Sequence, residues 1–197
     1  MHENQEKINK YVLLAIQHNN HHNIFKRQNA DGVWREDIFD CEPLLKEIKD
    51  NKKILDLGTG GGMPGILISI MKPKNNILLV EKNQKKAYFL KKVISELDLK
   101  NTELFNKNFC VNNNLGVFDL IVSRAFASIE KTLELTKKNI NKNTKYLLLK
   151  GKKSTIDEEL KTLDYKKYVF KTNKLDFFEK ERHIVEIKIK EWTKSSL

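Results

Sequence analysis

The stretch Asp56-Leu57-Gly58-Thr59-Gly60-Gly61-Gly62 carries the strongest structural signal in this chain. The apolar run 54–57 before the glycines is typical of a short buried strand, and the run 66–71 after them is typical of a helix. Glycines at such a strand-to-helix turn let a ligand lie against the backbone. The segment therefore predicts a strand, a glycine turn and a helix that together bind a flat, polar molecule.

The spacing of the glycines narrows the class of ligand. A dinucleotide-binding GxGxxG turn needs a glycine at position 63, which is Met63, and the lysine and hydroxyl pair of a phosphate-binding P-loop is missing. Glu81 ends the next predicted strand, 19 residues beyond Gly62, close to the distance at which an acidic side chain accepts hydrogen bonds from ribose hydroxyls. The GxGxG turn and this carboxylate predict S-adenosylmethionine as the cofactor.

Strand-like and helix-like segments alternate along the rest of the chain. Strands are predicted at 77–80, 102–105, 118–123 and 146–149, and helices at 84–97 and 129–140. This alternation is typical of a parallel sheet. Two strand-like segments in the tail, 166–172 and 183–190, are expected to form an antiparallel pair at the sheet edge. We predict an α/β, Rossmann-like fold with a mostly parallel seven-stranded sheet and an antiparallel edge strand.

The first 50 residues have a different pattern. Segments 5–18 and 41–49 predict two short helices, joined by a polar stretch that contains Arg27 and Trp34. We expect residues 1–50 to form a small N-terminal helical appendage and residues 51–197 to form the Rossmann-like domain. The histidines between His18 and His22 are expected to be exposed, and no role is assigned to them.

The amino-acid composition indicates which kinds of partner and which cellular location to expect. Lys and Arg outnumber Asp and Glu by 37 to 26, a net charge of +11, which favours a nucleic acid although AT-rich codon usage would also enrich Lys, Asn and Ile. Cys41 and Cys110 form no CxxC pair and no metal-ligand spacing with the histidines, so neither a metal nor a disulfide framework is expected. No apolar run reaches the length of a membrane span, and we expect a cytoplasmic protein.

The end of the fourth predicted strand reads Ser123-Arg124-Ala125-Phe126-Ala127-Ser128. In sheets of this kind, chemistry on the acceptor usually takes place there. An Asn/Asp-Pro-Pro-aromatic motif, which would accept hydrogen bonds from an exocyclic amine, is missing from the sequence. Neither cysteine follows a proline or threonine, as a nucleophile for pyrimidine C5 commonly does. Both of these reaction classes are therefore disfavoured.

Four blocks of sequence resemble one family. The segments 56–65 and 123–128, together with Leu148-Leu149-Lys150-Gly151 and Glu181-Arg182-His183, occur in the same order in the bacterial small-subunit (16S) ribosomal RNA guanine-N7 methyltransferases. These are also called the glucose-inhibited division protein B family, or methyltransferase G. The resemblance covers roughly residues 10 to 190 and implies a class I S-adenosylmethionine-dependent methyltransferase fold.

The resemblance also implies roles for individual residues. Those that would contact the cofactor are Gly58, Gly60, Gly62, Met63, Glu81 at its ribose, Phe109 and Cys110 at its adenine, and Arg124 beside the methyl donor. Arg124, Lys150 and Arg182 would form the active site, with the last two at its rim, where cations hold RNA phosphate or the target guanine. The implied substrate is N7 of a guanine in 16S rRNA or the small ribosomal subunit, and the implied enzyme is a monomer without a metal.

Three departures from the family pattern stand out. Family members commonly carry Arg-His-x-x-Asp-Ser where this chain has the segment 36–41, of which only the aspartate, Asp40, is kept. Asn108 stands where an arginine is common, and Met63 stands where Phe or Leu is usual. The changes at Asp37 and Asn108 put the N-terminal contribution to binding, and the strength of cofactor or RNA binding, in question.

Several alternatives stay open on the sequence. The chain could methylate another RNA position, a protein or a small molecule, or it could be a ribosome-associated RNA-binding protein that has lost activity. A dinucleotide-dependent oxidoreductase is disfavoured by Met63 and the antiparallel tail. The lysines at 85, 86, 91 and 92 are explained most simply as the polar face of an amphipathic helix. Arg124→Ala is expected to reduce methyl transfer far more than stability, because a strand-end arginine contributes little to a core.

Overall fold

The computed structural model describes residues 2–22, 26–27, 29–175 and 180–190. Its strands are β1 (Lys53–Leu57), β2 (Asn76–Val80), β3 (Thr102–Phe105), β4 (Leu120–Arg124), β5 (Lys145–Lys150), β6 (Tyr168–Lys174) and β7 (His183–Ile189). Its α-helices are α1 (His2–His22), α2 (Ala30–Val33), α3 (Phe39–Cys41), α4 (Gly65–Met71), α5 (Gln84–Glu96), α6 (Ile129–Thr136) and α7 (Lys153–Lys161). A π-helical turn (Trp34–Ile38) and two 3₁₀ helices (Glu42–Glu47 and Lys137–Asn139) complete the helical segments.

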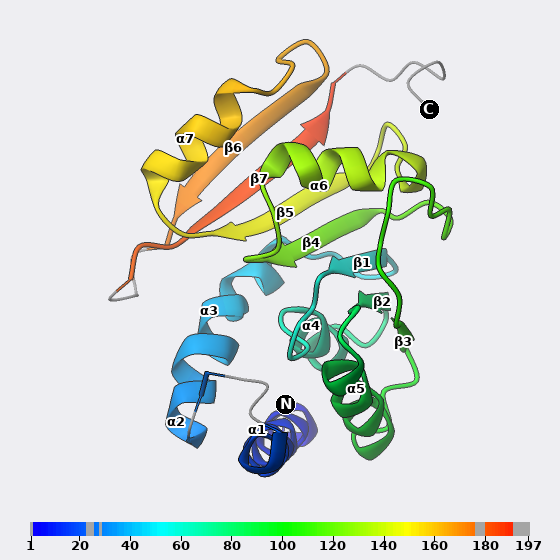
Figure 1. Ribbon diagram of the computed structural model, residues 1–197, viewed down its shortest axis with the longest axis vertical. Coiled ribbons are helices and arrows are strands. Elements are labelled where there is room, and N and C mark those ends of the chain that lie inside the picture. Colours follow the sequence, from blue (N-terminus) through cyan, green and yellow to red (C-terminus); the bar gives the residue numbers. More distant parts are fainter. Residues whose placement is uncertain (1, 23–25, 28, 176–179, 191–197) are drawn as a thin grey trace.

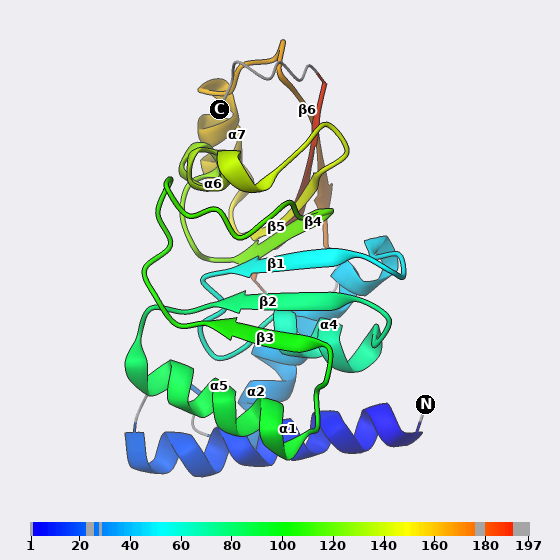
Figure 2. The same cartoon turned by 90° about the vertical axis from the view of Figure 1, so that its right-hand side faces the viewer.

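The strands form one sheet in the order β3-β2-β1-β4-β5-β7-β6. The neighbours from β3 to β5 pair in parallel, whereas β7 is antiparallel to both β5 and β6. Figure 2 shows the arrowheads of β1, β2 and β3 on the same side of the sheet. Because β2 and β4 flank β1 on opposite sides, the strand order reverses at the carboxyl end of β1, where open α/β sheets bind their ligands.

The two faces of the sheet carry separate hydrophobic clusters. Alternate residues of β1 point to opposite faces, so Ile54 joins the cluster with α1, α4 and α5, and Leu55 joins the cluster with α6 and α7. Figures 1 and 2 both show α1 and α5 lying side by side below the sheet. A sheet covered on both faces needs strands that are apolar throughout, which explains the continuous apolar runs in the sequence.

The predicted elements of the Rossmann-like part are confirmed within a few residues at each end. The antiparallel pairing of the two tail segments is confirmed as well, with β6 outermost and β7 one place in from the edge. Helix α7 was not expected, because it presents only Ile156 and Leu160 to the core. Two buried apolar residues in nine are too few for a helical periodicity to be recognised.

The N-terminal prediction needs correction. Helix α1 continues to His22, residues 30–40, expected to be a polar connection, lie largely in short helical segments, and the helix expected at 41–49 is a 3₁₀ helix at Glu42–Glu47. Asp37 and Asp40, polar in the sequence, are buried there, and ion pairs with distant arginines hold them in place. Tertiary contacts therefore decide the structure of this segment more strongly than its local pattern.

Helix α1 packs on the Rossmann-like part of the chain. Ile8 and Tyr11 are buried in the cluster that also contains Ile54, and the Tyr11 hydroxyl donates to the carbonyl of Gly61 over 2.8 Å. Burial is the main reason that the pKa of Tyr11 lies above its ordinary value, so the phenol stays a neutral donor. Among the described residues, no helix is long and apolar enough to cross a membrane.

Candidate active site

The glycine turn after β1 has the open backbone that the sequence predicts. Gly58, Gly60 and Gly62 have positive φ angles of 71°, 61° and 105°, and the Thr59 amide donates to the Val80 carbonyl over 3.0 Å. A Cβ atom on Gly58 would lie 2.1 Å from the Phe126 ring, whereas a Cβ on Gly60 would meet nothing nearer than a carbonyl oxygen at 3.9 Å. The turn thus exposes the backbone at Gly60, as a cradle for a cofactor requires.

Asp56 fixes this turn from below. Its Oδ2 accepts hydrogen bonds from the Thr59 hydroxyl over 2.6 Å and from the Gly65 amide over 2.8 Å. Its Oδ1 is buried and has no hydrogen-bond partner among the described residues. Burial raises the pKa of Asp56 to about 6, against the effect of the two hydrogen bonds. The carboxylate ties the end of β1 to the start of α4.

The residues assigned to the ribose and adenine lie at the ends of the neighbouring strands. Glu81 follows β2, and its Oε1 accepts from the Asn83 amide over 2.7 Å. Phe109 is buried with its ring 6.4 Å from that of Phe105, while Cys110 is exposed, and the Cys110 amide donates to Asn113 over 2.7 Å. The structure therefore places Glu81 and the segment after β3 at the same edge as the glycine turn.

Met63 lies in the same turn, but its side chain belongs to the core. It is 3% exposed, and its amide donates to the Thr59 carbonyl over 3.2 Å. Only its backbone is therefore in a position to meet a ligand above the turn. A change between Met, Phe and Leu at this position changes packing beneath the site.

Arg124 ends β4 and turns toward the N-terminal segment. Its Nη2 lies 2.5 Å from Oδ1 of Asp37, its Nη1 lies 3.4 Å from Oδ2 of Asp40, and Nη1 also donates to the Glu36 carbonyl over 2.7 Å. Burial disfavours the charged guanidinium, but Cys41, Asp37 and Asp40 outweigh this effect and raise the pKa of Arg124 above its ordinary value. The side chain is firmly held as a cation.

A second arginine meets the same aspartate. Arg182 donates from Nε to Oδ1 of Asp40 over 2.7 Å, and Asp40 is only 4% exposed. Arg27 binds the other buried carboxylate, with Nε 3.3 Å from Oδ2 of Asp37. Asp37 and Asp40 therefore form, with Arg27, Arg124 and Arg182, a connected cluster of buried and half-buried charges, which we call the arginine–aspartate cluster.

Lys150 is held on the other side of the turn after β4. Its Nζ donates to the Ala127 carbonyl and to Oε2 of Glu159, both over 2.7 Å. The same Glu159 oxygen accepts from the Ile129 amide over 2.8 Å. Lys150 thus anchors the segment 125–128, which brings Phe126 onto Gly58. Ala125 has a positive φ of 51°, which makes this sharp turn possible.

The register of the sheet brings the three predicted cations together. Arg124 lies opposite Leu149 in the β4–β5 pair, and Lys150 lies opposite His183, which follows Arg182. These cations are not merely solvated at strand ends, because each has a carboxylate partner and none of the three is fully exposed. The argument that Arg124 contributes little to stability fails for the same reason. The roles of the three residues in catalysis stay predictions.

Sequence reasoning gave no role to four residues of this region. Asp37 was seen only as a departure from a family pattern, and Asp40 only as a retained aspartate. Tyr11 of α1 and Phe126 after β4 contact the glycine turn at Gly61 and Gly58. The signal available in the sequence was that Asp40 matches the family pattern while nearby Asp37 departs from it. No spacing rule connects residues that lie more than 80 positions apart.

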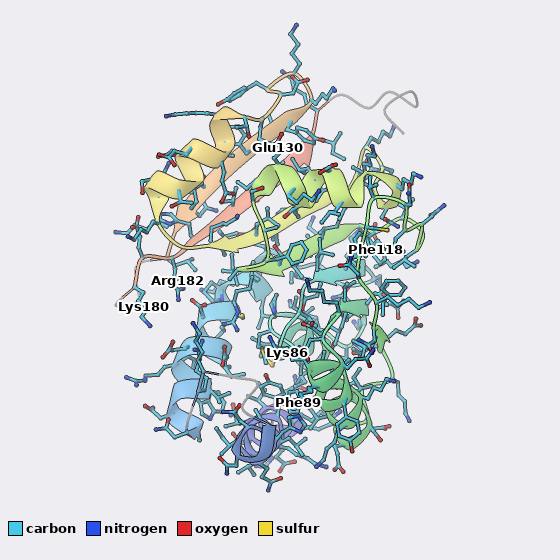
Figure 3. All side chains as sticks on the ribbon, viewed as in Figure 1. Lys86, Phe89, Phe118, Glu130, Lys180 and Arg182 are labelled. Atoms are coloured by element: carbon cyan, nitrogen blue, oxygen red, sulfur yellow. The ribbon has the colours of Figure 1, made fainter. Side chains whose placement is uncertain are left out.

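A cavity of about 780 Å³ opens beside the arginine–aspartate cluster, between the segment 35–47 and residues of the ranges 173–175 and 180–184. Arg182 and Asp40 line it, whereas neither the glycine turn nor Glu81 does. Figure 3 shows Arg182 and Lys180 together on one side of the carboxyl edge and Lys86 on the other. The chemistry of the glycine turn, rather than this cavity, identifies where a cofactor fits.

Sequence comparison gives one consistent family. The family model described as rRNA small subunit methyltransferase G matches residues 4–185. A relative named Ribosomal RNA small subunit methyltransferase G from Mesoplasma florum is 32% identical over 210 residues, covering 98% of this chain and 88% of the relative. The protein of the same name from Brachyspira hyodysenteriae is 35% identical over 185 residues, covering 92% and 89%.

Solved structures share the fold at lower identity. A methyltransferase from Pyrococcus furiosus matches with a TM-score of 0.61 at 18% identity, covering 77% of this chain and 81% of that one. TrmK from M. capricolum, solved with the cofactor product S-adenosyl-homocysteine, matches with a TM-score of 0.62 at 17% identity, covering 78% and 69%. Both likenesses concern the arrangement of the sheet and helices.

Proposed function

Because this chain belongs to the rRNA small subunit methyltransferase G family, we propose that its carboxyl-edge site methylates N7 of a guanine. The protein is an S-adenosylmethionine-dependent methyltransferase, and its substrate is the 16S rRNA of the small ribosomal subunit. The observation that carries the proposal is the contact of Phe126 with Gly58, which joins the turn after β4 to the glycine turn after β1.

The residues at this edge fit the cofactor in shape and chemistry. S-adenosylmethionine supplies a methyl group on a sulfonium. The open backbone at Gly58, Gly60 and Gly62 would lie against it, with the Met63 backbone at the end of the turn. Glu81 would accept hydrogen bonds from its ribose hydroxyls, and Phe109 and Cys110 would flank its adenine. The orphaned Oδ1 of Asp56 shows that the turn is built around a polar interior.

Guanine N7 suits a site that works by alignment. Its lone pair lies in the ring plane and carries no proton, so no side chain has to act as a general base. The chain's contribution is then to orient the guanine and to exclude water, the two effects that proximity and preorganised charge provide. Phe126, about one third exposed beside Gly58, offers an aromatic face on which an unstacked base can rest.

The three cations have distinct parts in this proposal. Arg124 would sit beside the methyl donor, and Arg182 would hold RNA phosphate or guanine O6 at the rim, leaving N7 free. Lys150 would share that rim while it anchors the turn through Ala127. Residues 1–50 would form the N-terminal unit and residues 51–197 the catalytic one. Asp37 and Asp40 of the N-terminal unit orient the arginines.

We further propose that the enzyme acts as a monomer in the cytoplasm. The proposed cofactor residues and the three cations all come from one chain, so a second copy need not complete the site. Analytical ultracentrifugation at micromolar concentration tests the assembly state. A dimer that dissociates with loss of activity would contradict it.

The decisive experiment is transfer of labelled methyl from S-adenosylmethionine to small ribosomal subunits that lack the modification, followed by nucleoside mass spectrometry. The expected product is 7-methylguanosine, and Glu81→Gln should reduce its formation. Label in a different nucleoside would overturn the N7 assignment while leaving the cofactor in place. If no label enters although S-adenosylhomocysteine binds, the proposed reaction at this site is wrong.

A further inference from the structure

Helix α5 carries a run of lysines that the proposed reaction does not use. The α5 basic face consists of Lys82, just before the helix, and of Lys85, Lys86, Lys91 and Lys92 within it. All but Lys86 are exposed. Among the described residues, none of the five has a carboxylate within ion-pair distance, so their charges are available to a partner.

Several lysines of other helices are paired with a carboxylate. Lys7 binds Glu3 on α1, Lys131 binds Glu134 on α6, and Lys153 binds Asp157 on α7. The acidic residue of α5, Glu96, accepts from Lys10 of α1 at 2.9 Å. An amphipathic helix that only needs solubility gains from such pairs along its own surface. The α5 basic face lacks them.

Two of these lysines also lie at the N-terminal end of the helix, where positive charge lowers helix stability. Lys85 and Lys86 occupy the first turn of α5, which contains no acidic residue. The positive end of a helix dipole disfavours cations there. A local arrangement that opposes helix stability is expected where a binding function requires it. An anion bound at this end would relieve the repulsion.

The α5 basic face begins at the proposed cofactor site. Glu81, the proposed ribose-binding residue, binds the amide of Asn83, the N-cap of α5. Lys82 lies between them in the sequence, and Lys107 follows Asn106, which donates to the Glu81 carbonyl over 2.7 Å. Figure 3 shows Lys86 on the α5 side of the carboxyl edge, opposite Arg182. A polyanion reaching the site would therefore meet cations on both sides.

An exposed aromatic ring lies among these charges. Tyr88 is 66% exposed, and Lys85, Lys91 and Lys92 are its neighbours at helical spacings of three and four residues. Its ring lies 6.3 Å from that of His18 in α1, which supports it from one side. Aromatic rings between cations are typical of surfaces that bind single-stranded nucleic acid, where bases stack and phosphates pair.

We propose that the α5 basic face is a docking surface for RNA, on which the lysines bind phosphates next to the target guanine and Tyr88 stacks on an unpaired base. The inference rests on the proposed function, because it takes the substrate strand to cross the edge between α5 and Arg182. The protein's net charge of +11 favours RNA, a polyanion charged along its whole backbone, over a short acidic protein segment as the partner.

The test compares two triple variants of the full-length protein. One combines Lys85→Gln, Lys91→Gln and Lys92→Gln. The control combines Lys49→Gln, Lys142→Gln and Lys166→Gln, which removes the same charge from exposed loops that lead into β1, β5 and β6 at the opposite edge of the sheet. The probe is 16S rRNA transcribed in vitro, titrated at several salt concentrations. S-adenosylhomocysteine binding is measured on each protein.

The α5 variant should bind the RNA roughly tenfold more weakly, and its slope of log K against log salt should be shallower by about 2. The control should change little, and S-adenosylhomocysteine affinity should be unchanged in both. Tyr88→Ala should also weaken RNA binding several-fold, and Tyr88→Phe should restore it because the ring remains. Equal losses in the α5 variant and the control would overturn the proposal.

Two further outcomes separate this inference from the proposed function. If the wild type forms 7-methylguanosine and the α5 variant matches it in RNA affinity, the docking surface is wrong and the reaction stands. If the α5 variant loses RNA affinity but the wild type forms no 7-methylguanosine, the reaction is wrong and the docking surface stands. If the α5 variant loses only its binding to anionic phospholipid vesicles and keeps its RNA affinity, the proposed RNA docking surface is also wrong.

Discussion

Arg182 and Asp40 are joined by a 2.7 Å hydrogen bond although 142 positions separate them in the chain. The other carboxylate oxygen of Asp40 lies 3.4 Å from Arg124, so one buried carboxylate holds two of the three cations predicted for the active site. The N-terminal segment therefore binds two of the residues predicted for the site, and it also contributes buried residues to the core.

Replacing Asp40 should affect folding and activity together. Asp40→Asn leaves two guanidinium groups with a neutral partner, and breaking a buried ion pair in this way costs about 3–5 kcal/mol of unfolding free energy. Urea denaturation measures the loss. Asp31→Asn is the matched control, because Asp31 pairs with Arg35 at the surface and its loss should cost less than about 1 kcal/mol. Similar values for both variants would contradict the buried role.

Arg124 should be sensitive to the shape of its head group as well as to its charge. Arg124→Ala should lower unfolding free energy by about 3 kcal/mol, because it leaves Asp37 and Asp40 partly unpaired. Arg124→Lys keeps the charge but cannot reach both carboxylates and the Glu36 carbonyl. Its unfolding free energy should therefore lie between those of the wild type and of Arg124→Ala. Methyl transfer, assayed well below the melting temperature, should drop about a hundredfold in Arg124→Ala. Unchanged stability in that variant would contradict the ion-pair cluster.

The glycine turn allows folding and cofactor binding to be separated. Gly58→Ala should cost about 1–2 kcal/mol for its positive φ, and more for the clash with Phe126. Gly60→Ala has the same backbone cost but open space around its Cβ, so it should fold better while it still weakens S-adenosylhomocysteine binding. Thermal melts and calorimetric titration check both. A Gly60 variant with wild-type affinity would remove Gly60 from the cofactor site.

Glu81 should matter to the cofactor more than to the fold. Glu81→Gln retains an oxygen that can accept from the Asn83 amide but loses the charge, which roughly halves the strength of a hydrogen bond to a ribose hydroxyl. We expect the dissociation constant for S-adenosylhomocysteine to rise about tenfold or more. Glu103→Gln, at an exposed position on β3, is the control and should leave the constant unchanged. Equal effects would argue against a ribose contact.

Asp56 should make stability depend on pH. Its pKa is raised to about 6 in the folded protein, above that of an unfolded aspartate, so the folded state holds the proton more tightly. Its contribution is therefore present at pH 4 and is lost as the pH rises toward 6. Relative to Asp56→Asn, the wild type should lose up to about 3 kcal/mol of unfolding free energy across that window. A difference that is flat in pH would show that the carboxyl is not buried as described.

The fold was predictable where one signal dominated. Strands β1, β2, β4 and β5 coincide with mainly apolar runs, because a strand buried on both faces is mostly apolar. The antiparallel pair of β6 and β7 was predictable from the missing helix between them. Helix α7 and the helical turns within residues 30–40 were not, since their helical structure depends on contacts with distant segments rather than on an apolar stripe.

The site was predictable only in its backbone part. The glycine turn can be recognised in the sequence because a tight turn restricts the residue type. Glu81 can be recognised because it ends the next strand at a characteristic spacing from the glycines. The ion pairs of Asp37 and Asp40 are invisible, because a carboxylate in sequence carries no record of its partner. The position of Phe126 depends on a positive φ at Ala125, which no residue-type preference announces.

The place of β7 between β5 and β6 has a consequence for how the protein is made. The last described strand fills an interior position of the sheet, and Arg182, immediately before it, completes the contact with Asp40. A nascent chain that has emerged only as far as β6 lacks β7, the strand with which β6 pairs, and lacks the second arginine for Asp40. Strand β7 must therefore be synthesised before the sheet is complete, and a chain terminated before β7 would leave β5 as an unpaired edge that can pair with other chains.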